Sequence, residues 1–365
     1  MKTTILSLML AVISIVSPLT LAHHSFASTF KIGEKITIEG VVSKYSFKNP
    51  HVLLYTNVTA DDGSVTEWVS EGASATSVRR RGLDRDTFKE GDIVRITGDK
   101  THDGSPMTSI DTIDIMDPRG FVRRNAYGGS EGPGERRRPP APIVKADPMP
   151  LKLADGRPNL TGAWTIVGMS GGLPHKPEPD FSERGAALQD GYDVTTDDPQ
   201  LFCEPPGLMR QAGTTPHPIR ITQLDDHVVI EDEEYGGRRE IYFDDSRDKN
   251  IKTHLGDSVA RYEGDKLIIE TDNLLSNLVA HQGVRLSDQT TVVETYHRAD
   301  TQVNGPVLAI SVVATDPVNL NSELVMIRNK MSAGDYTFIE SDCTPPLRKS
   351  DPYPCVSSFY FIKPV

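Results

Sequence analysis

The amino-acid sequence predicts an all-β protein built from two barrels, an OB-like small barrel followed by a lipocalin-like antiparallel β-barrel. Runs of alternating apolar and polar residues, the pattern of half-buried strands, recur through both halves of the chain between Gly- and Asp-rich turns. A helical pattern is confined almost entirely to one short segment before residue 82. The length of 365 residues exceeds the ~100–200 residues of a usual domain, so two domains are expected.

Residues 1–22 have the layout of a secretory signal peptide. Lys2 precedes a short apolar run, Ile5–Val16, and a small-x-small cleavage pattern ends at Ala22. Cleavage there makes His23 the first mature residue, although cleavage after Ala27 also satisfies the small-residue rule. No later apolar run approaches the ~20 residues of a membrane-spanning helix, so we expect a periplasmic or secreted protein with no transmembrane segment.

Residues 23–117 are predicted to form the OB-like domain. Five alternating runs with one helix between the third and the fourth follow the order of an OB-type, partly open barrel. We expect strands at 35–42, 51–58, 65–69, 91–98 and 108–115, and the helix at 73–81.

Residues 118–158 are predicted to be a linker, because Pro and Gly are too frequent there for a sheet. The middle of this segment is basic, with Arg136, Arg137 and Arg138 in succession. A solvated linker is the simpler interpretation, and docking of these arginines on an acidic envelope protein partner is the alternative.

Residues 159–365 are predicted to form the lipocalin-like β-barrel domain. Gly162-Ala163-Trp164 resembles the Gly-x-Trp that opens lipocalin-type barrels, where the indole fills the closed end. The Pro- and Gly-rich residues 165–216 are expected to form a long loop over one end of the barrel. Strands are expected at 219–222, 227–232, 239–243, 258–262, 266–271, 290–298, 307–314, 323–329 and 336–341.

The mature N-terminus is a candidate metal site. If His23 is the first residue, its α-amine and imidazole chelate a metal together, and one more imidazole completes a three-nitrogen set that suits copper(II). His24 and His51 are the candidates for that third nitrogen, so the predicted site consists of His23, His24 and His51, with copper as a candidate cofactor. A frayed polar terminus without metal is the competing interpretation.

Other polar residues match no convincing catalytic or metal-binding motif. Residues 168–172 satisfy the G-x-S-x-G pattern of a hydrolase nucleophile elbow, but the Pro-rich residues that follow cannot form the helix that the elbow requires, so we interpret them as a loop. The acidic run of Asp225, Asp226 and Glu231–Glu234 lacks the spacing of a calcium loop, and we interpret it as a solvated strand end with its turn. Four histidines of the second domain are expected to be packed or surface residues, namely His217, His254, His281 and His297.

Four motifs in the first domain resemble a widespread family of exported bacterial proteins, a domain of unknown function. They are the mature start HHSFA at residues 23–27, Asn49-Pro50-His51, Arg80-Arg81-Gly82 and Gly91-Asp92-x-Val94, and the resemblance covers roughly residues 22–117. The remainder is similar to the partner domain often fused to it, on Asn159-Leu160-Thr161-Gly162-Ala163-Trp164 and on the segment that begins at Cys203. The resemblance implies export and no established activity.

Three cysteines in an oxidising compartment predict one disulfide and one remaining thiol. The resemblance places cysteines at the positions of Cys203 and Cys343, and therefore implies a disulfide between them. A local bridge between Cys343 and Cys355 is the alternative.

The function expected from these features is binding of a small apolar or aromatic molecule in the barrel of the second domain, with the copper site as a possible addition. The formal net charge of −12 repels phosphate backbones, so we expect no nucleic-acid partner. The alternative is a periplasmic enzyme, either a copper-dependent oxidoreductase or a lyase, isomerase or hydrolase acting in the barrel. An enzyme would need titratable residues such as His254, His281 or Glu294 inside the cavity.

Overall fold

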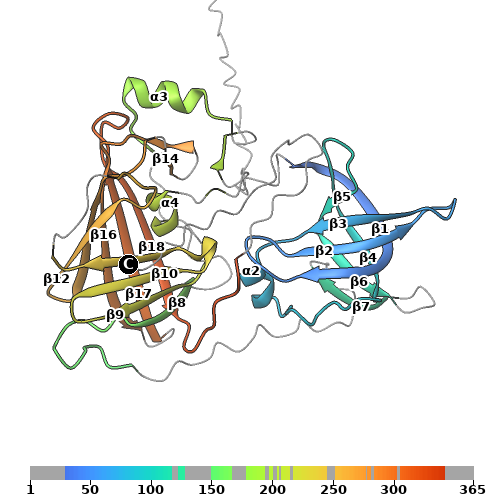
Figure 1. Cartoon of the computed structure of the whole chain (residues 1–365), viewed down its shortest axis with the longest axis horizontal. Helices are drawn as coiled ribbons and strands as arrows, with labels where there is room; N and C mark the ends of the chain where they lie inside the picture. The colour runs from blue at the N-terminus through green and yellow to red at the C-terminus, as the bar shows by residue number, and fades with distance from the viewer. Residues whose placement is uncertain are drawn as a thin grey trace, which may run out of the picture.

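The computed structural model contains two β-barrels that lie side by side, with the short helix α2 between them (Figure 1). His23, His24, the three cysteines and the Arg136–Arg138 cluster lie outside the described residues. The structure describes residues 29–116, the backbone of 122–127, and residues 149–166, 178–193, 197–199, 204, 207–213, 217–244, 251–276, 278–280, 283–301 and 305–341.

The first barrel has the strand order of an OB fold, as the sequence predicts. Its strands follow the order β1-β2-β3-β5-β4, and pairing of β1 with β4 closes the barrel. Strand β3 runs parallel to β5, whereas the other neighbours in this barrel are antiparallel. The bounds are β1 Phe30–Ser46, β2 Leu53–Thr59, β3 Val65–Glu71, β4 Ile93–Thr101 and β5 Met107–Ser109.

Strand β1 is long enough to pair with a strand on each side. Its first half pairs with β4 and its second half with β2, with a register shift between Val42 and Lys44. Ile38, Val42 and Leu54 point into the core of this barrel. The alternation of apolar and polar residues that predicts these strands is therefore confirmed.

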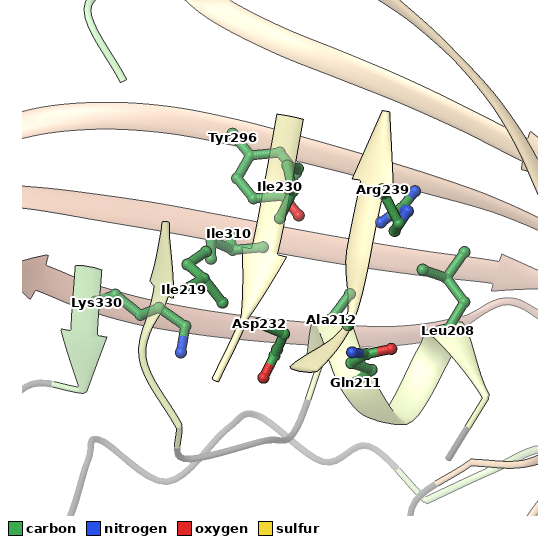
Figure 2. A pocket seen from close by; sticks show the side chains of 11 residues that line it. Leu208, Gln211, Ala212, Ile219, Ile230, Asp232, Arg239, Tyr296, Ile310 and Lys330 are labelled. Carbon is green, nitrogen blue, oxygen red and sulfur yellow. The ribbon is translucent and has the colours of Figure 1, made fainter. Parts of the chain in front are cut away.

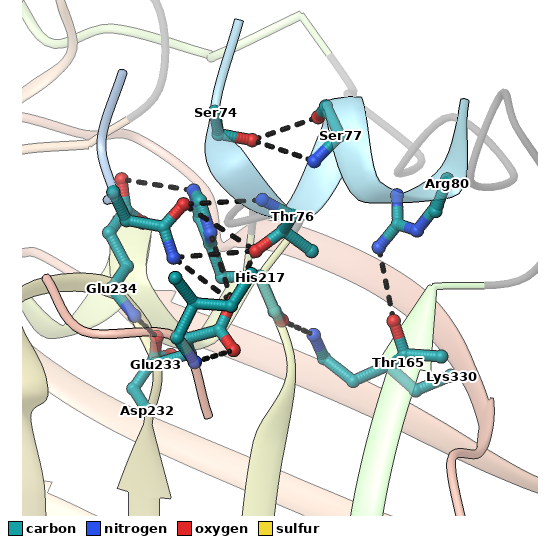
Figure 3. Close-up of polar contacts among 12 residues, drawn as sticks. Ser74, Thr76, Ser77, Arg80, Thr165, His217, Asp232, Glu233, Glu234 and Lys330 are labelled. Carbon is teal, nitrogen blue, oxygen red and sulfur yellow. Dashed lines mark hydrogen bonds and ion pairs between the residues drawn. The ribbon is translucent and has the colours of Figure 1, made fainter. Parts of the chain in front are cut away.

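Helix α2 (Ala75–Arg80) forms where the sequence predicts a helix, before β4. The Oγ of Ser74 caps its N-terminus by accepting a hydrogen bond from the backbone N–H three residues on, at 3.2 Å. Val78 packs into the core of the first barrel. Thr76 and Arg80 lie on the face that meets the second barrel (Figure 3).

The predicted fifth strand is divided into β5 and β6 (Thr112–Met116). Strand β5 pairs with β3 and with the end of β4 at Lys100, whereas β6 pairs with the first half of β4. The chain passes β4 so closely at the division that a Cβ on Gly98 would lie 1.8 Å from the carbonyl oxygen of Ser109, which only glycine permits. Strand β7 (Val122–Tyr127) continues the ladder beside β6, within the range predicted as linker.

Among the described residues, nine strands close the second barrel in the order β10-β11-β12-β13-β16-β17-β18-β8-β9. Its described strand pairs are antiparallel except β11 and β12, which meet in parallel at Tyr242 and Val259. The predicted all-β barrel is confirmed with this one parallel contact. The bounds are β8 Gly162–Ile166, β9 Ile219–Gln223, β10 His227–Asp232, β11 Arg238–Tyr242, β12 Asp257–Glu263, β13 Lys266–Asp272, β16 Thr291–Thr301, β17 Gly305–Thr315 and β18 Leu324–Ser332.

Strand β8, with the buried Trp164, lies between β18 and β9 and completes the second barrel. The run predicted as a strand at 336–341 is not part of this barrel. It reaches the first barrel instead, where Ile339 joins the core and Ser341 pairs with Asn49 in an isolated bridge. The prediction was wrong because alternation indicates that one face is buried, but not which surface buries it.

The predicted long loop contains two short helices, α3 (Glu183–Asp190) and α4 (Leu208–Gly213), near one end of the second barrel (Figure 1). A small sheet of β14 (Leu278–Val279) and β15 (Arg285–Leu286) contacts α3. Helix α4 contributes Leu208 to the barrel core. Within the part of the chain that the structure describes, no helix has the length and hydrophobicity needed to span a bilayer.

Candidate functional site

The candidate site is the interior of the second barrel behind helix α4, together with the contact between this end of the barrel and α2. A cavity of about 20 Å³ lies inside the barrel, which is room for about one water molecule. Asp232, Arg239 and Lys330 bring charged groups to the cavity (Figure 2). Most of its wall is apolar and is formed by Leu208, Ala212, Ile219, Ile230 and Ile310.

A bidentate ion pair crosses the barrel interior beside this cavity. Arg239 on β11 donates to both carboxylate oxygens of Glu294 on β16, at 3.1 and 2.7 Å. The Tyr296 hydroxyl donates to Glu294 at 2.7 Å, and Arg239 also donates to Ser258 Oγ at 2.9 Å. Burial acts to lower the pKa of Arg239, but the Glu294 carboxylate outweighs it and raises that pKa. Both charges are therefore well compensated, as is required of a pair in which Glu294 is fully buried and the Arg239 side chain is only 11 % exposed.

Part of the acidic run that we interpret from sequence as a solvated strand end is in fact buried. Asp225 and Asp226 are exposed at the turn before β10. Asp232, Glu233 and Glu234 are each at most 6 % exposed. The interpretation was wrong for these three because α2 and the segment after β18 cover this end of β10.

Glu233 is the centre of the contact between the two barrels (Figure 3). Its carboxylate accepts hydrogen bonds from Thr76 Oγ1 on α2, from Asn49 Nδ2 at 3.1 Å and from the Ile339 N–H at 2.8 Å. All four residues are at most 4 % exposed. The contact therefore depends on a charge-assisted hydrogen-bond network, in which one acceptor serves donors from three segments of the chain.

Burial and neighbouring charges shift the pKa values of the acidic and basic groups in this network. Burial acts to raise the pKa of Glu233, but contacts with His217 and other donors outweigh it, so the pKa lies below its ordinary 4.5. His217 lies 3.7 Å from Glu234, and although burial acts to lower its pKa, the nearby carboxylates raise it. Burial, followed by Glu234, raises the pKa of Asp232 to about 7.

Three basic side chains lie next to the network. Lys330 on β18 is 1 % exposed and donates to the His217 carbonyl oxygen at 2.5 Å. Arg80 of α2 donates to Thr165 Oγ1 at 3.1 Å. Arg328 is 4 % exposed, and its Nε and Nη1 have no hydrogen-bond partner in the described part of the chain. Burial lowers the pKa of Arg328 to about 10 and also lowers the pKa of Lys330.

The charged residues of this interior were not predicted from the sequence. Glu294, named only as an example of a titratable group that an enzyme would need in the cavity, is buried inside the barrel. His281 lies outside the described residues, and His254 is half-buried, with a pKa that burial lowers. The missed signal is the alternation along β18, which puts Arg328 and Lys330 on the same inner face as the core residue Met326.

The candidate copper ligand His51 lies in the loop before β2. Its Nδ1 is 2.9 Å from the carbonyl oxygen of Gly72 and 3.4 Å from a carboxylate oxygen of Glu71. Because a carbonyl can only accept, this contact places the proton on Nδ1 and the ring's lone pair on Nε2. His23 and His24 lie outside the described residues, and within those ranges no three His, Cys, Asp or Glu side chains are grouped to hold a metal ion.

The fold and the site define a class of all-β protein. In the described part of the chain, an OB-like barrel meets a nine-stranded barrel through a buried polar interface. Residues 11–109 match the model of a protein family of unknown function, DUF6152. The matched range ends with β5 of the first barrel. No curated protein matches the chain. Function therefore has to be inferred from the residues of the site.

Proposed function

We propose that the chain is an exported binding protein, periplasmic or secreted, that takes a small apolar or aromatic molecule inside a lipocalin-like second barrel. The observation that carries this proposal is the cavity behind α4, where an apolar wall meets a few convergent polar groups. Sites for small molecules commonly have this composition. Barrels of similar size hold one small ligand in other proteins, which supports the same assignment.

Ligand entry requires that α4 moves. Small-molecule pockets occupy roughly 300–1000 Å³, whereas the cavity has about 20 Å³ in this conformation. Leu208, Gln211 and Ala212 of α4 form one side of the cavity, and barrel strands form the rest together with Gly237, which directly precedes β11. Displacement of this six-residue helix leaves the strand pairs of the barrel intact, so α4 is the element that we expect to make room.

The substitution Ala212→Phe tests this proposal because it fills the space between α4 and the barrel wall. We expect the wild-type protein to bind the neutral aromatic probe N-phenyl-1-naphthylamine with an increase in fluorescence. Ala212→Phe should bind it at least about tenfold more weakly, a loss of about 1.4 kcal/mol. Ala187→Phe, at an exposed position of α3, is the matched control and should bind as the wild type does. Absence of wild-type binding, or equal binding by both variants, would contradict the proposal.

A copper(II) site at the mature N-terminus is a second candidate function, and the orientation of His51 favours it. Metal-binding histidines usually donate their second ring N–H to a carbonyl or carboxylate, as His51 does to Gly72. In this proposal His23 supplies its α-amine and imidazole, and His51 supplies the third nitrogen.

Calorimetric titration of copper(II) into the cleaved protein tests the second candidate. His51→Ala and the addition of one residue before His23 should each abolish tight binding, whereas His297→Ala on β16 should not. Affinity should fall as the pH drops through about 6.5, because a protonated imidazole cannot coordinate. A chelate of His23 and His24 alone would survive His51→Ala, and that result would exclude the three-nitrogen site.

A further inference from the structure

We propose that Arg328, Lys330 and Arg80 bind a carboxylate group of the ligand, at the end of the barrel cavity that meets α2. The inference rests on the proposed function, because the apolar body of the ligand would occupy the cavity behind α4. It adds the chemical class of the ligand, a small apolar or aromatic acid in its singly ionised form.

Arg328 is the residue that carries this inference. It is 4 % exposed, and neither its Nε nor its Nη1 has a hydrogen-bond partner among the described residues. Each of the two edges by which a guanidinium binds a carboxylate therefore retains an N–H without a partner. A buried charge left in this state is strongly unfavourable, and a bound carboxylate would compensate both its charge and its donors.

The position of Arg328 on β18 places it beside the cavity. Ile310 lies directly opposite on β17, and Lys330 is the next residue on the same inner face of β18. Both of these neighbours line the cavity. An acid held by Arg328 would therefore direct its apolar part along Ile310 and into the space behind α4.

The charges around Arg328 favour a singly charged anion. Arg80 is close enough to lower the pKa of both Arg328 and Lys330, so three cations share this end of the barrel. Asp232 and Glu234 face Arg328 and act to raise its pKa against the larger effect of burial, and Glu233 acts in the same direction on Arg80. These carboxylates attract the cations but repel each added negative charge, which disfavours a doubly charged phosphate relative to a carboxylate.

A matched pair of probes isolates the contribution of charge. The acid 4-phenylbutyrate and its amide, 4-phenylbutyramide, have nearly the same shape and differ in charge. In calorimetric titrations at pH 7, we expect the wild-type protein to bind the acid at least tenfold more tightly than the amide. Arg328→Met should lose this preference and still bind the amide. Arg261→Met, on the exposed face of β12, is the control and should retain the wild-type preference.

Thermal unfolding without ligand provides a second, independent readout. Arg328→Met should unfold at the wild-type temperature or above it, because an apolar side chain of similar length replaces a buried guanidinium whose Nε and Nη1 have no hydrogen-bond partner among the described residues. A lower midpoint would mean that Arg328 has a structural partner, and it would overturn the inference. Wild-type binding of the naphthylamine probe without any preference for the acid would overturn this inference alone. Failure of every probe to bind would overturn the proposed function as well.

Discussion

Replacement of Glu233 by alanine is expected to lower the free energy of unfolding by about 3–5 kcal/mol, because it removes the shared acceptor of a buried charge-assisted network. The donors left without that acceptor are Thr76 Oγ1, Asn49 Nδ2 and the Ile339 N–H. Urea denaturation measures the effect as a lower midpoint. Glu231→Ala, two residues earlier on β10, should change the free energy of unfolding by less than about 0.5 kcal/mol. The Glu231 side chain is partly exposed, and its carboxylate lies 3.7 Å from the guanidinium of Arg220.

The contribution of Glu233 to the free energy of unfolding should depend on pH. The pKa of Glu233 in the folded protein lies below its ordinary 4.5. A carboxylate of this kind stabilises the folded state fully above its unfolded pKa, and the contribution is lost as the pH falls through the folded pKa. The difference in stability between wild type and Glu233→Gln should therefore be largest near pH 7 and decrease below pH 4.5. A difference that stays constant down to pH 3 would show that charge is not the cause.

The second large effect is expected inside the second barrel, on replacement of Glu294 by glutamine. This change leaves Arg239, whose side chain is 11 % exposed, as a largely buried charge without a counter-ion, and loss of one partner of a buried pair typically costs about 3–5 kcal/mol. The double variant Arg239→Met with Glu294→Leu should recover much of the loss, because two apolar side chains remove the unpaired charge. Chemical denaturation of Arg239→Met, of Glu294→Leu and of the variant that carries both substitutions forms a double-mutant cycle, which measures the coupling between the two residues.

An exposed ion pair on the same barrel is the control for this cycle. Arg261 and Glu270 lie 2.6 Å apart on β12 and β13, and both side chains are nearly half exposed. Glu270→Gln should therefore cost less than about 1 kcal/mol. If Glu294→Gln were no more costly than Glu270→Gln, the buried pair would not be important for the stability of the barrel.

Local patterns in the sequence predict the first barrel almost completely. The runs at 35–42, 51–58 and 65–69 correspond to β1, β2 and β3, and the segment at 73–81 contains α2. These signals are local because alternation and the Ser74 cap involve residues close together in the chain. The division between β5 and β6 was not predictable, because it depends on how closely the chain passes a strand that is distant in sequence.

The charged interior was much less predictable. Glu294 was named only as a residue that an enzyme would need inside the barrel, and nothing local to it indicates Arg239, which lies 55 positions away. The acidic run at the end of β10 has the composition of a solvated strand end. It is buried because Thr76, 157 positions from Glu233, covers it together with the rest of α2.

The sequence by itself determined the all-β class, the two barrels and their order, because strand alternation and turns are properties of neighbouring residues. The tertiary structure alone decided that the segment at 336–341 lies on the first barrel, that Glu233 joins the two barrels, and that Arg328 and Lys330 lie inside the second one. The physical reason is the same in each case. Burial depends on which distant surface covers a residue, and a charged side chain is stabilised there only by groups that folding brings to it.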